Sequence, residues 1–487
     1  MSKFIMPVFS SLSTRTALYE KFKSKIIHNP FLDRNLVSYQ GNKQTPFSSW
    51  FKYREGFSER LVTYILQTLQ PKPGILLDPF SGSGTSLFTA SQLGWESTGI
   101  ELLPVGIFAT EARIISQRIN TKELKTVISK FPKIDFRCYY KDVFAFHHLG
   151  ITRGAFSEIN EKKLVGYLSY CHDLITDESI QKLLIYTAFC ILEDISYTRK
   201  DGQYLRWDFR SGRSKSKREF NKGEILSFEE AIQRKLKQIV SDLELSSIQL
   251  DLFCDNQLSQ LADSKFGNLE NLSPKIYEGS CLKLLPNFQD NSIDFVITSP
   301  PYLNRYDYTR TYALELAFLG CGEDKVKNLR QQMLSCTVEN RDKRTYLEEY
   351  YTSKERYNDF LKIDAIFKQQ AALQEVLMIL EKNKNEGNLN NKNIARMVHN
   401  YFYEMCFVIH ELSRILKSGG IIAIVNDNVK YAGEEIPVDL ILSDIAESFG
   451  LRTRYIWTLG RGKGNSSQQM GNYGRTELRK CVYIWEK

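Results

Sequence analysis

Short apolar runs that end in turns occupy the first third of the chain and its C-terminal half, and helical periodicity separates them. Seven of these runs predict strands, at 75–78, 97–101, 275–278, 294–298, 421–426, 451–457 and 479–485. A helical stretch joins the first two runs, and such a crossover makes the strands parallel. We therefore predict an α/β fold, with a mostly parallel sheet of seven strands, Rossmann-like in form, and helices on both faces.

Two long stretches interrupt this alternation. Residues 116–270 carry helical periodicity and a basic segment, whereas residues 322–396 are helical and polar and end in an Asn-rich loop at 383–393. The predicted organisation is an N-terminal extension at 1–49, sheet-forming segments at 50–115, 271–321 and 397–487, and largely helical insertions at 116–270 and 322–396.

Composition places the chain among ordinary folded proteins. Its 487 residues are 42% hydrophobic and 25% charged, which excludes wholesale disorder, collagen-like repeats and coiled coil. No apolar run approaches the roughly 18 residues of a membrane helix, and the N-terminus lacks a signal peptide's apolar region. The nine cysteines include no CxxC pair, so we expect a cytoplasmic protein with reduced thiols, no metal site and no membrane partner.

Positive charge is concentrated in one segment. Between Arg199 and Lys222 there are nine basic residues against three acids, and Trp207 and Phe209 alternate with arginines. Basic side chains neutralise phosphates, so this segment predicts nucleic-acid binding, and a solvated loop is the alternative interpretation. The predicted contacts are Arg206, Arg210, Arg213, Lys215, Lys217 and Arg218.

A glycine-containing loop leaves the first strand as DPFSGSGT, residues 78–85. Gly82 and Gly84 let the backbone turn tightly against a ligand. The loop lacks the lysine of a P-loop and the third glycine of a dinucleotide fingerprint, which disfavours ATP and a dehydrogenase's NAD. Glu101 ends the second strand, where a carboxylate can accept hydrogen bonds from ribose hydroxyls. A nucleoside cofactor without phosphates, such as S-adenosylmethionine, fits this pattern.

A second loop, TSPPY, follows the strand at 294–298 directly. Pro300 and Pro301 have no N–H, so the backbone there can only accept hydrogen bonds, and the Ser299 hydroxyl can accept as well. Such a turn suits a substrate with an amino group, and Tyr302 offers a flat face on which a planar base can stack. A rigid surface turn with a core tyrosine is the alternative.

Together the two loops resemble those of the DNA amino methyltransferases, which move the methyl group of S-adenosylmethionine to an exocyclic base nitrogen. The resemblance covers about 50–115, 275–320 and 398–487 and leaves both insertions unmatched. It implies a target-recognition region at 116–270, between the two loops. The Ser form of the tetrapeptide, with Ser299, is typical of cytosine N4 methylation and the Asp form of adenine N6 methylation.

The resemblance also implies roles for individual residues. The expected cofactor contacts are Ser58, Asp78, Pro79, Phe80, Gly82, Gly84, Thr85, Glu101 and Ser280. Ser280 departs from the family pattern, in which an Asp ending the third strand binds the adenine amino group, and Asp142 is a rival for that contact. The expected catalytic residues are Ser299, Pro300, Pro301 and Tyr302, with Arg305 as a further DNA contact.

The prediction is therefore a site-specific methyltransferase that acts on a flipped cytosine in double-stranded DNA, within a restriction–modification system. The expected partners are DNA and a cognate restriction endonuclease. An N6-adenine enzyme on the same scaffold is the nearest alternative. An RNA amino methyltransferase and a non-catalytic DNA-binding subunit are more distant ones.

Overall fold

The computed structural model describes residues 13–70, 72–201, 204–213, 219–255, 272–460 and 478–487. Its main sheet has eight strands in the order β1-β11-β12-β8-β7-β2-β3-β6. Their bounds are β1 (Ile26–His28), β2 (Ile75–Asp78), β3 (Glu96–Glu101), β6 (Lys275–Glu278), β7 (Ile293–Thr298), β8 (Leu416–Asp427), β11 (Arg452–Thr458) and β12 (Lys480–Glu486). All seven predicted strands are present, and the mostly parallel α/β fold is confirmed.

The eighth strand, β1, comes from the N-terminal region and pairs in parallel with β11, so the seven-strand prediction was one strand short. Its three residues are too few to show an alternating pattern. Only β12 runs antiparallel to its neighbours, β11 and β8. The helix α18 (Ile394–Ile415) is followed directly by β8, which contains Gly419 and Gly420.

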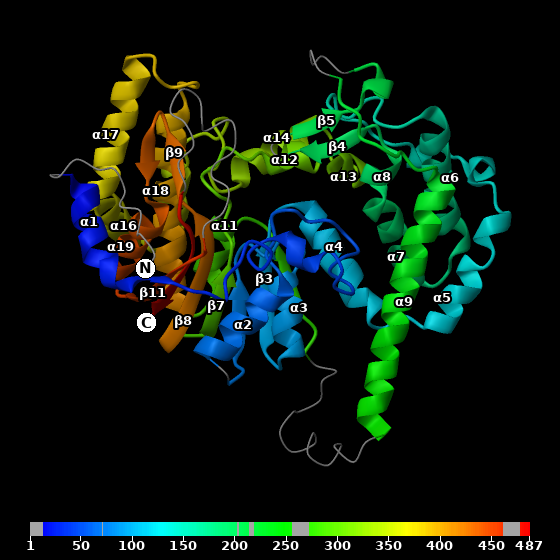
Figure 1. Ribbon diagram of the computed structural model, residues 1–487, viewed down its shortest axis with the longest axis horizontal. Coiled ribbons are helices and arrows are strands. Elements are labelled where there is room, and N and C mark those ends of the chain that lie inside the picture. The colour runs from blue at the N-terminus through cyan, green and yellow to red at the C-terminus, as the bar shows by residue number, and fades with distance from the viewer. Residues whose placement is uncertain (1–12, 71, 202–203, 214–218, 256–271, 461–477) are drawn as a thin grey trace.

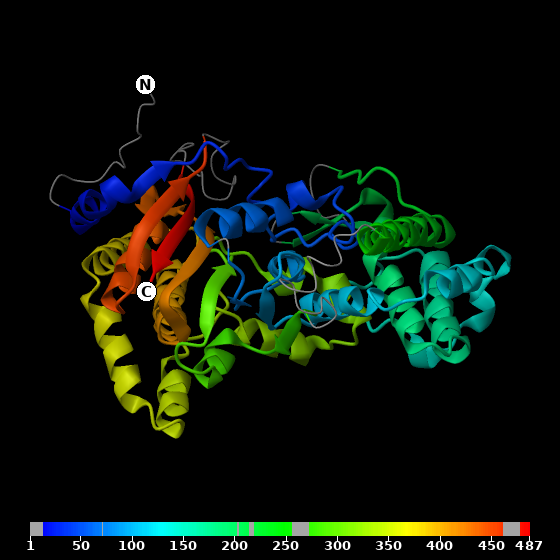
Figure 2. The ribbon, with the colours of Figure 1, turned by 90° about the horizontal axis from the view of Figure 1, so that it is seen from below.

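The sheet is buried on both faces (Figures 1 and 2). Successive residues of β7 pack on opposite faces of the sheet. Phe295 and Ile297 belong to one apolar cluster and Val296 belongs to another. One face packs against α2 (Glu59–Leu69) and α3 (Thr85–Gln92). The other packs mainly against α18 and α19 (Val438–Ser448). This layered core holds the carboxyl ends of the central parallel strands at one edge.

The remaining helices lie beside these layers and in the insertions. Those near the sheet are α1 (Thr14–Phe22), α4 (Pro104–Ser116), α11 (Cys281–Leu284), α12 (Tyr308–Thr311), α13 (Ala313–Phe318), α14 (Glu323–Gln332), α15 (Arg344–Ser353), α16 (Tyr357–Gln369) and α17 (Ala371–Asn385). A small hairpin, β9 (Val429–Tyr431) with β10 (Glu434–Ile436), follows β8. Among the described residues, no helix is both long and apolar enough to cross a membrane.

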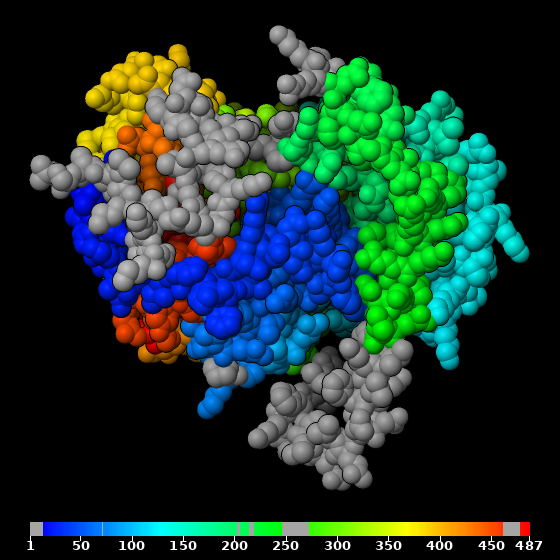
Figure 3. All heavy atoms as spheres, viewed as in Figure 1, coloured from blue at the N-terminus to red at the C-terminus, as the bar shows by residue number. Residues whose placement is uncertain are grey.

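The described residues of the insertion at 116–270 form a lobe at one side of the molecule (Figure 3, cyan and green). Its helices are α5 (Thr121–Ile128), α6 (Glu158–Leu174), α7 (Glu178–Cys190), α8 (Leu192–Ile195) and α9 (Phe228–Asp255). It is not wholly helical, because β4 (Thr198–Asp201) and β5 (Tyr204–Trp207) form an antiparallel hairpin. The hairpin carries the first part of the basic segment.

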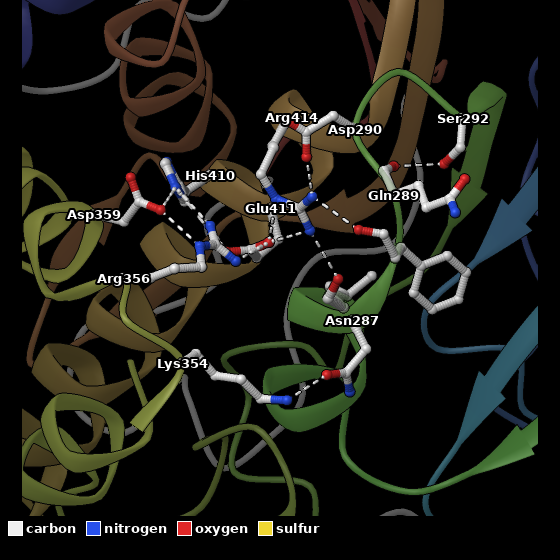
Figure 4. A network of polar contacts seen from close by, with 12 residues as sticks. Asn287, Gln289, Asp290, Ser292, Lys354, Arg356, Asp359, His410, Glu411 and Arg414 are labelled. Carbon is white, nitrogen blue, oxygen red and sulfur yellow. Dashed lines mark hydrogen bonds and ion pairs between the residues drawn. The ribbon is translucent and has the colours of Figure 1, made fainter. Parts of the chain in front are cut away.

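A network of charges ties α18 to its neighbours at the edge where β8 begins (Figure 4). The buried Glu411 carboxylate accepts hydrogen bonds from Arg356, at 2.7 Å, and from Arg414, at 2.8 Å. Arg414 also donates to the carbonyls of Leu285 and Phe288, in the segment before β7. One carboxylate therefore joins α16, α18 and the segment that leads into β7.

We predict that Glu411→Ala lowers the free energy of unfolding by about 3 to 5 kcal/mol, because two largely buried arginines lose their shared carboxylate. Glu381→Ala is the matched control, since Glu381 pairs with Lys384 at the surface and its removal should cost about 0 to 1 kcal/mol. Urea denaturation of both variants measures the difference. Equal losses would contradict the structural role given to Glu411.

Candidate active site

A pocket of about 800 Å³, counting the part open to solvent, lies at the carboxyl ends of β2, β3, β6 and β7. Open parallel sheets bind ligands at this edge. Its lining includes seven of the expected cofactor contacts, namely Asp78, Pro79, Phe80, Gly82, Thr85, Glu101 and Ser280. Ser299 and Pro301 of the second loop line the same pocket. The structure therefore brings the two predicted loops together in one site.

The first loop turns sharply at Gly82 and Gly84, which have φ of +53° and +78°. A Cβ atom at Gly82 would lie 2.7 Å from Cε1 of Tyr53, whose ring is buried and stacked on Tyr312. Gly84 precedes α3 and does not line the pocket. The loop thus depends on glycine at both positions, but only Gly82 faces the ligand space.

Glu101 holds the loop from the neighbouring strand. Its carboxylate accepts hydrogen bonds of 2.7 Å from the backbone N–H of Gly82 and of Leu103. Burial raises the pKa of Glu101 to about 7, and these backbone donors oppose the shift. Each oxygen keeps a further lone pair, so the carboxylate can still accept hydrogen bonds from a ligand in the pocket.

Asp78 connects the two loops. One carboxylate oxygen accepts a 2.6 Å hydrogen bond from the hydroxyl of Thr298, the residue before Ser299, and a 3.0 Å bond from the N–H of Phe80. The other oxygen accepts from the Ser86 hydroxyl on α3. Burial raises the pKa of Asp78 to about 6. This carboxylate fixes the position of the second loop relative to the first.

The second loop leaves β7 with Ser299 half-buried at the pocket. The Ser299 oxygen lies 3.1 Å from the carbonyl oxygen of Val425 on β8 and 3.3 Å from the hydroxyl oxygen of Tyr302. Donation to Val425 leaves the serine lone pairs free to accept. Burial raises the pKa of the Tyr302 phenol above its usual value, so this hydroxyl stays protonated. Pro300 and Tyr302 flank the pocket but do not line it.

Comparison with known proteins gives matches over almost the whole chain. It is 43% identical over 475 residues to the type II methyltransferase M.AvaI of Nostoc sp., which covers 97% of this chain and 92% of that protein. It is 40% identical over 485 residues to the type II methyltransferase M.BsoBI of Geobacillus stearothermophilus, covering 96% and 91%. A type II methyltransferase of Methanocaldococcus jannaschii, M.MjaII, matches at 32% over only 76 residues, 16% of this chain and 14% of that protein.

The chain belongs to the type II DNA methyltransferases. No family model matches it, and no solved structure does. The prediction of a DNA methyltransferase of the restriction–modification kind is therefore confirmed. The target base, the cofactor and the roles of single residues stay predictions.

Of three polar residues that were predicted as possible cofactor contacts in this methyltransferase, one lines the pocket and two do not. Ser58 is buried at the start of α2, where its hydroxyl donates to the carbonyl of Leu36 and accepts from the N–H of Leu61, so it does not line the pocket. Ser280 lines the pocket and donates to the carbonyl of Gln332. Asp142 is exposed in the insertion and does not line the pocket.

Three of the predicted DNA contacts, Arg206, Arg210 and Arg213, have partners within the methyltransferase's insertion. Arg206 pairs with Asp201 at 3.0 Å, and Arg210 pairs with the buried Asp208 at 2.7 Å. Arg213 lies over the ring of Trp207, 4.5 Å from its centre. The second loop's Arg305 donates to Asn390 and has a positive φ of 67°. Lys215, Lys217 and Arg218 lie outside the described residues.

The pocket residues that sequence reasoning missed include Tyr53, Glu55 and Phe57. All three come from KYREGFS at 52–58, a segment from which only Ser58 was predicted as a contact. Glu55 accepts a hydrogen bond from the hydroxyl of Tyr312, and burial raises its pKa. An acid beside aromatic residues just before the glycine loop was the available signal.

The pocket fits S-adenosylmethionine in its chemistry. It is lined by aromatic and small residues and by three acids, Asp78, Glu101 and Glu55. None of its described lining residues is lysine or arginine, so it offers no cationic side chain for a phosphate. A cationic sulfonium with an adenosine group suits such a lining better than a nucleotide does.

We predict that Gly82→Ala weakens binding of S-adenosylhomocysteine about tenfold or more, because the added Cβ meets the immobile Tyr53 ring and alanine resists the positive φ. Isothermal titration calorimetry measures this affinity. Gly450→Ala is the matched control, since Gly450 also has a positive φ of 89° but nothing lies within 4 Å of a Cβ there. A wild-type affinity in the Gly82→Ala variant would contradict the assignment of this loop to the ligand site.

We predict that S-adenosylhomocysteine binding weakens as pH falls through about 7, because the folded-state pKa of Glu101 lies there and ribose hydroxyls bind its ionised form. Below that pH the dissociation constant should rise by up to about tenfold per unit. Asp78, with a pKa of about 6, contributes only at lower pH. Glu101→Gln should bind weakly with a flat profile between pH 6.5 and 8.5, and an unchanged slope in that variant would refute the assignment.

Proposed function

We propose that this methyltransferase transfers the methyl group of S-adenosylmethionine to the exocyclic N4 of cytosine in duplex DNA. The observation that carries the proposal is the Asp78–Thr298 hydrogen bond of 2.6 Å, which joins the glycine loop to the Ser299 loop inside one pocket. A methyl donor on the first loop and an amino group on the second would then be neighbours. Holding two reactants in this way supplies much of the rate enhancement.

The cofactor would be held by this chain's own groups. Glu101 would accept hydrogen bonds from the ribose, and the Gly82 turn would admit the methionine part beside Asp78. Bound S-adenosylmethionine would supply an electrophilic methyl group on a positively charged sulfur. Glu55 and Asp78 would place negative charge near that cation in a largely apolar pocket.

The target amine would be oriented by the second loop. Cytosine N4 is a poor nucleophile, because its lone pair is delocalised into the ring. Hydrogen bonds from the amine to the Ser299 oxygen and the Pro300 carbonyl would localise that lone pair toward the methyl group. Ser299 is suited to this role since its own hydrogen can be donated to Val425. The nitrogen–methyl bond would form as the sulfur–methyl bond breaks, S-adenosylhomocysteine would leave, and N4 would lose one proton to solvent. No covalent intermediate on the enzyme is required.

The base would have to leave the DNA stack to reach this pocket. Tyr302 would offer its ring to the extruded base, and the insertion at 116–270 would hold the flanking duplex. Support for the second role comes from Arg206 on β5 and from Arg210 and Arg213, which follow β5 in the sequence, and Arg305 lies three residues after Tyr302. Phosphate contacts by such residues would make binding depend on salt. A cognate restriction endonuclease is the partner we expect in the cell.

Adenine N6 is the competing target on the same scaffold. Ser299, in place of an aspartate, favours cytosine, because the family resemblance associates the Ser form with N4 chemistry. The test is incubation of purified protein with methyl-labelled S-adenosylmethionine and unmethylated genomic DNA, followed by nucleoside digestion and mass spectrometry. We expect N4-methylcytosine, and a strong loss of labelling in Ser299→Ala. N6-methyladenine would overturn the base assignment, and label on neither nucleoside would overturn the reaction.

A further inference from the structure

The β4–β5 hairpin of the insertion presents two different faces. Arg199 lies opposite Arg206 and Lys200 lies opposite Leu205 in its antiparallel register. Because successive strand residues point to opposite sides, the arginine pair shares the outer face, and Lys200 and Leu205 are buried on the inner one. Two cations directly opposite each other repel, and Asp201 offsets only the charge of Arg206, so a phosphate between Arg199 and Arg206 would be favourable.

The inner face is anchored by a buried ion pair. Lys200 Nζ lies 2.5 Å from Glu315 Oε1 on α13, and their side chains are 3% and 1% exposed. The ammonium group also lies over the rings of Phe51 and Tyr312, 5.0 Å and 4.7 Å from their centres. The Lys200 ammonium group is therefore held by three residues that lie outside the insertion, Glu315, Phe51 and Tyr312.

Tyr312 continues this contact into the pocket. Its hydroxyl donates to Glu55 and accepts a 3.1 Å hydrogen bond from the N–H of Arg54. Its ring stacks on Tyr53, with centres 5.1 Å apart and planes 11° from parallel. Glu55 and Tyr53 both line the pocket. The path from the hairpin to the pocket wall thus consists of three direct contacts, Lys200 to Tyr312 to Glu55 and Tyr53.

A second set of contacts joins the insertion to the same segment before the glycine loop. Glu193 on α8 of the insertion lies 3.2 Å from Arg54 and 3.6 Å from Lys52. It also accepts, at 3.4 Å, from the backbone N–H of Lys200. Both links end on residues 52–55, the segment that leads into the pocket. The insertion therefore braces this wall through the hairpin and through α8.

We propose that Lys200 is a positioning residue that couples DNA binding on the hairpin to cofactor binding in the pocket. DNA that bridges Arg199 and Arg206 would hold the hairpin in place, and the Lys200–Glu315 pair would then hold Tyr312 and Glu55 against the cofactor. This inference rests on the proposed function. Coupling between two ligands is reciprocal, so bound cofactor would tighten DNA binding by the same factor.

The experiment measures the affinity for S-adenosylhomocysteine with and without a short duplex that carries the methylation site, which is mapped beforehand by modification-sensitive sequencing of DNA treated with the protein. We expect the duplex to tighten wild-type binding by about fivefold or more, a typical coupling between sites. The test variant is Lys200→Met/Glu315→Met, because replacing both members of a buried pair by apolar residues is often neutral for folding. This variant should still bind S-adenosylhomocysteine in the absence of DNA. The coupling factor, which is the ratio of the affinities with and without the duplex, should fall to about one.

Tyr312→Phe is the second variant, and it keeps the stacked ring while removing the hydrogen bond to Glu55. It should lose much of the coupling even if the double variant folds poorly. The matched control is Lys163→Met/Glu229→Met, which removes a 2.6 Å lysine–glutamate pair elsewhere in the insertion and should leave the coupling at its wild-type value.

Wild-type coupling retained by both Lys200→Met/Glu315→Met and Tyr312→Phe would overturn the proposal, as would a factor of one in the wild type. A wild-type protein that binds neither ligand would instead overturn the proposed function, so the two failures can be distinguished.

Discussion

The hydrogen bond between Asp78 and Thr298 is the constraint on which the site depends. β2 and β7 are parallel neighbours in the sheet, so their carboxyl ends meet at one edge, but adjacency alone would leave the two following loops free to diverge. Asp78 prevents this divergence by accepting from the Thr298 hydroxyl, the Phe80 amide and the Ser86 hydroxyl at once. A single side chain thereby sets the end of one strand, the start of α3 and the residue before Ser299.

That arrangement places negative charge where charge is costly. Burial raises the pKa of Asp78 to about 6 and that of Glu101 to about 7, although both accept several hydrogen bonds. Both acids are therefore less stable as anions than exposed carboxylates, and a cationic ligand with hydroxyl donors would relieve the cost. The same burial keeps the surrounding dipoles fixed. A site of this kind is arranged for its ligand before the ligand arrives.

The sheet and the two loops could be predicted because their signals are local. Apolar runs mark β2, β3, β7 and β8, and DPFSGSGT and TSPPY each lie at the end of such a run. β1 was not predicted because its three residues are too few to show an alternating pattern of apolar and polar positions. Glu55 was not predicted because the fold alone brings it into one pocket with the second loop, which follows it more than 200 residues later in the sequence. Ser58 illustrates the opposite case, since a serine before a helix is as well suited to capping as to ligand binding, and here its hydroxyl caps α2.

The insertion at 116–270 is less independent of the rest of the protein than its sequence predicts. A change from α/β alternation to helical periodicity is typical of a separate lobe, but its apolar cluster contains Trp50 and Phe51, α4 residues such as Val105, and α13 residues such as Leu314. A lobe that shares its core with the segment before the glycine loop cannot swing freely about a linker. The residues that would read the DNA are therefore held in register with the pocket by packing as well as by the buried Lys200–Glu315 pair. The insertion proposed for recognition thus shares an apolar cluster with Tyr53, which lines the pocket proposed for catalysis.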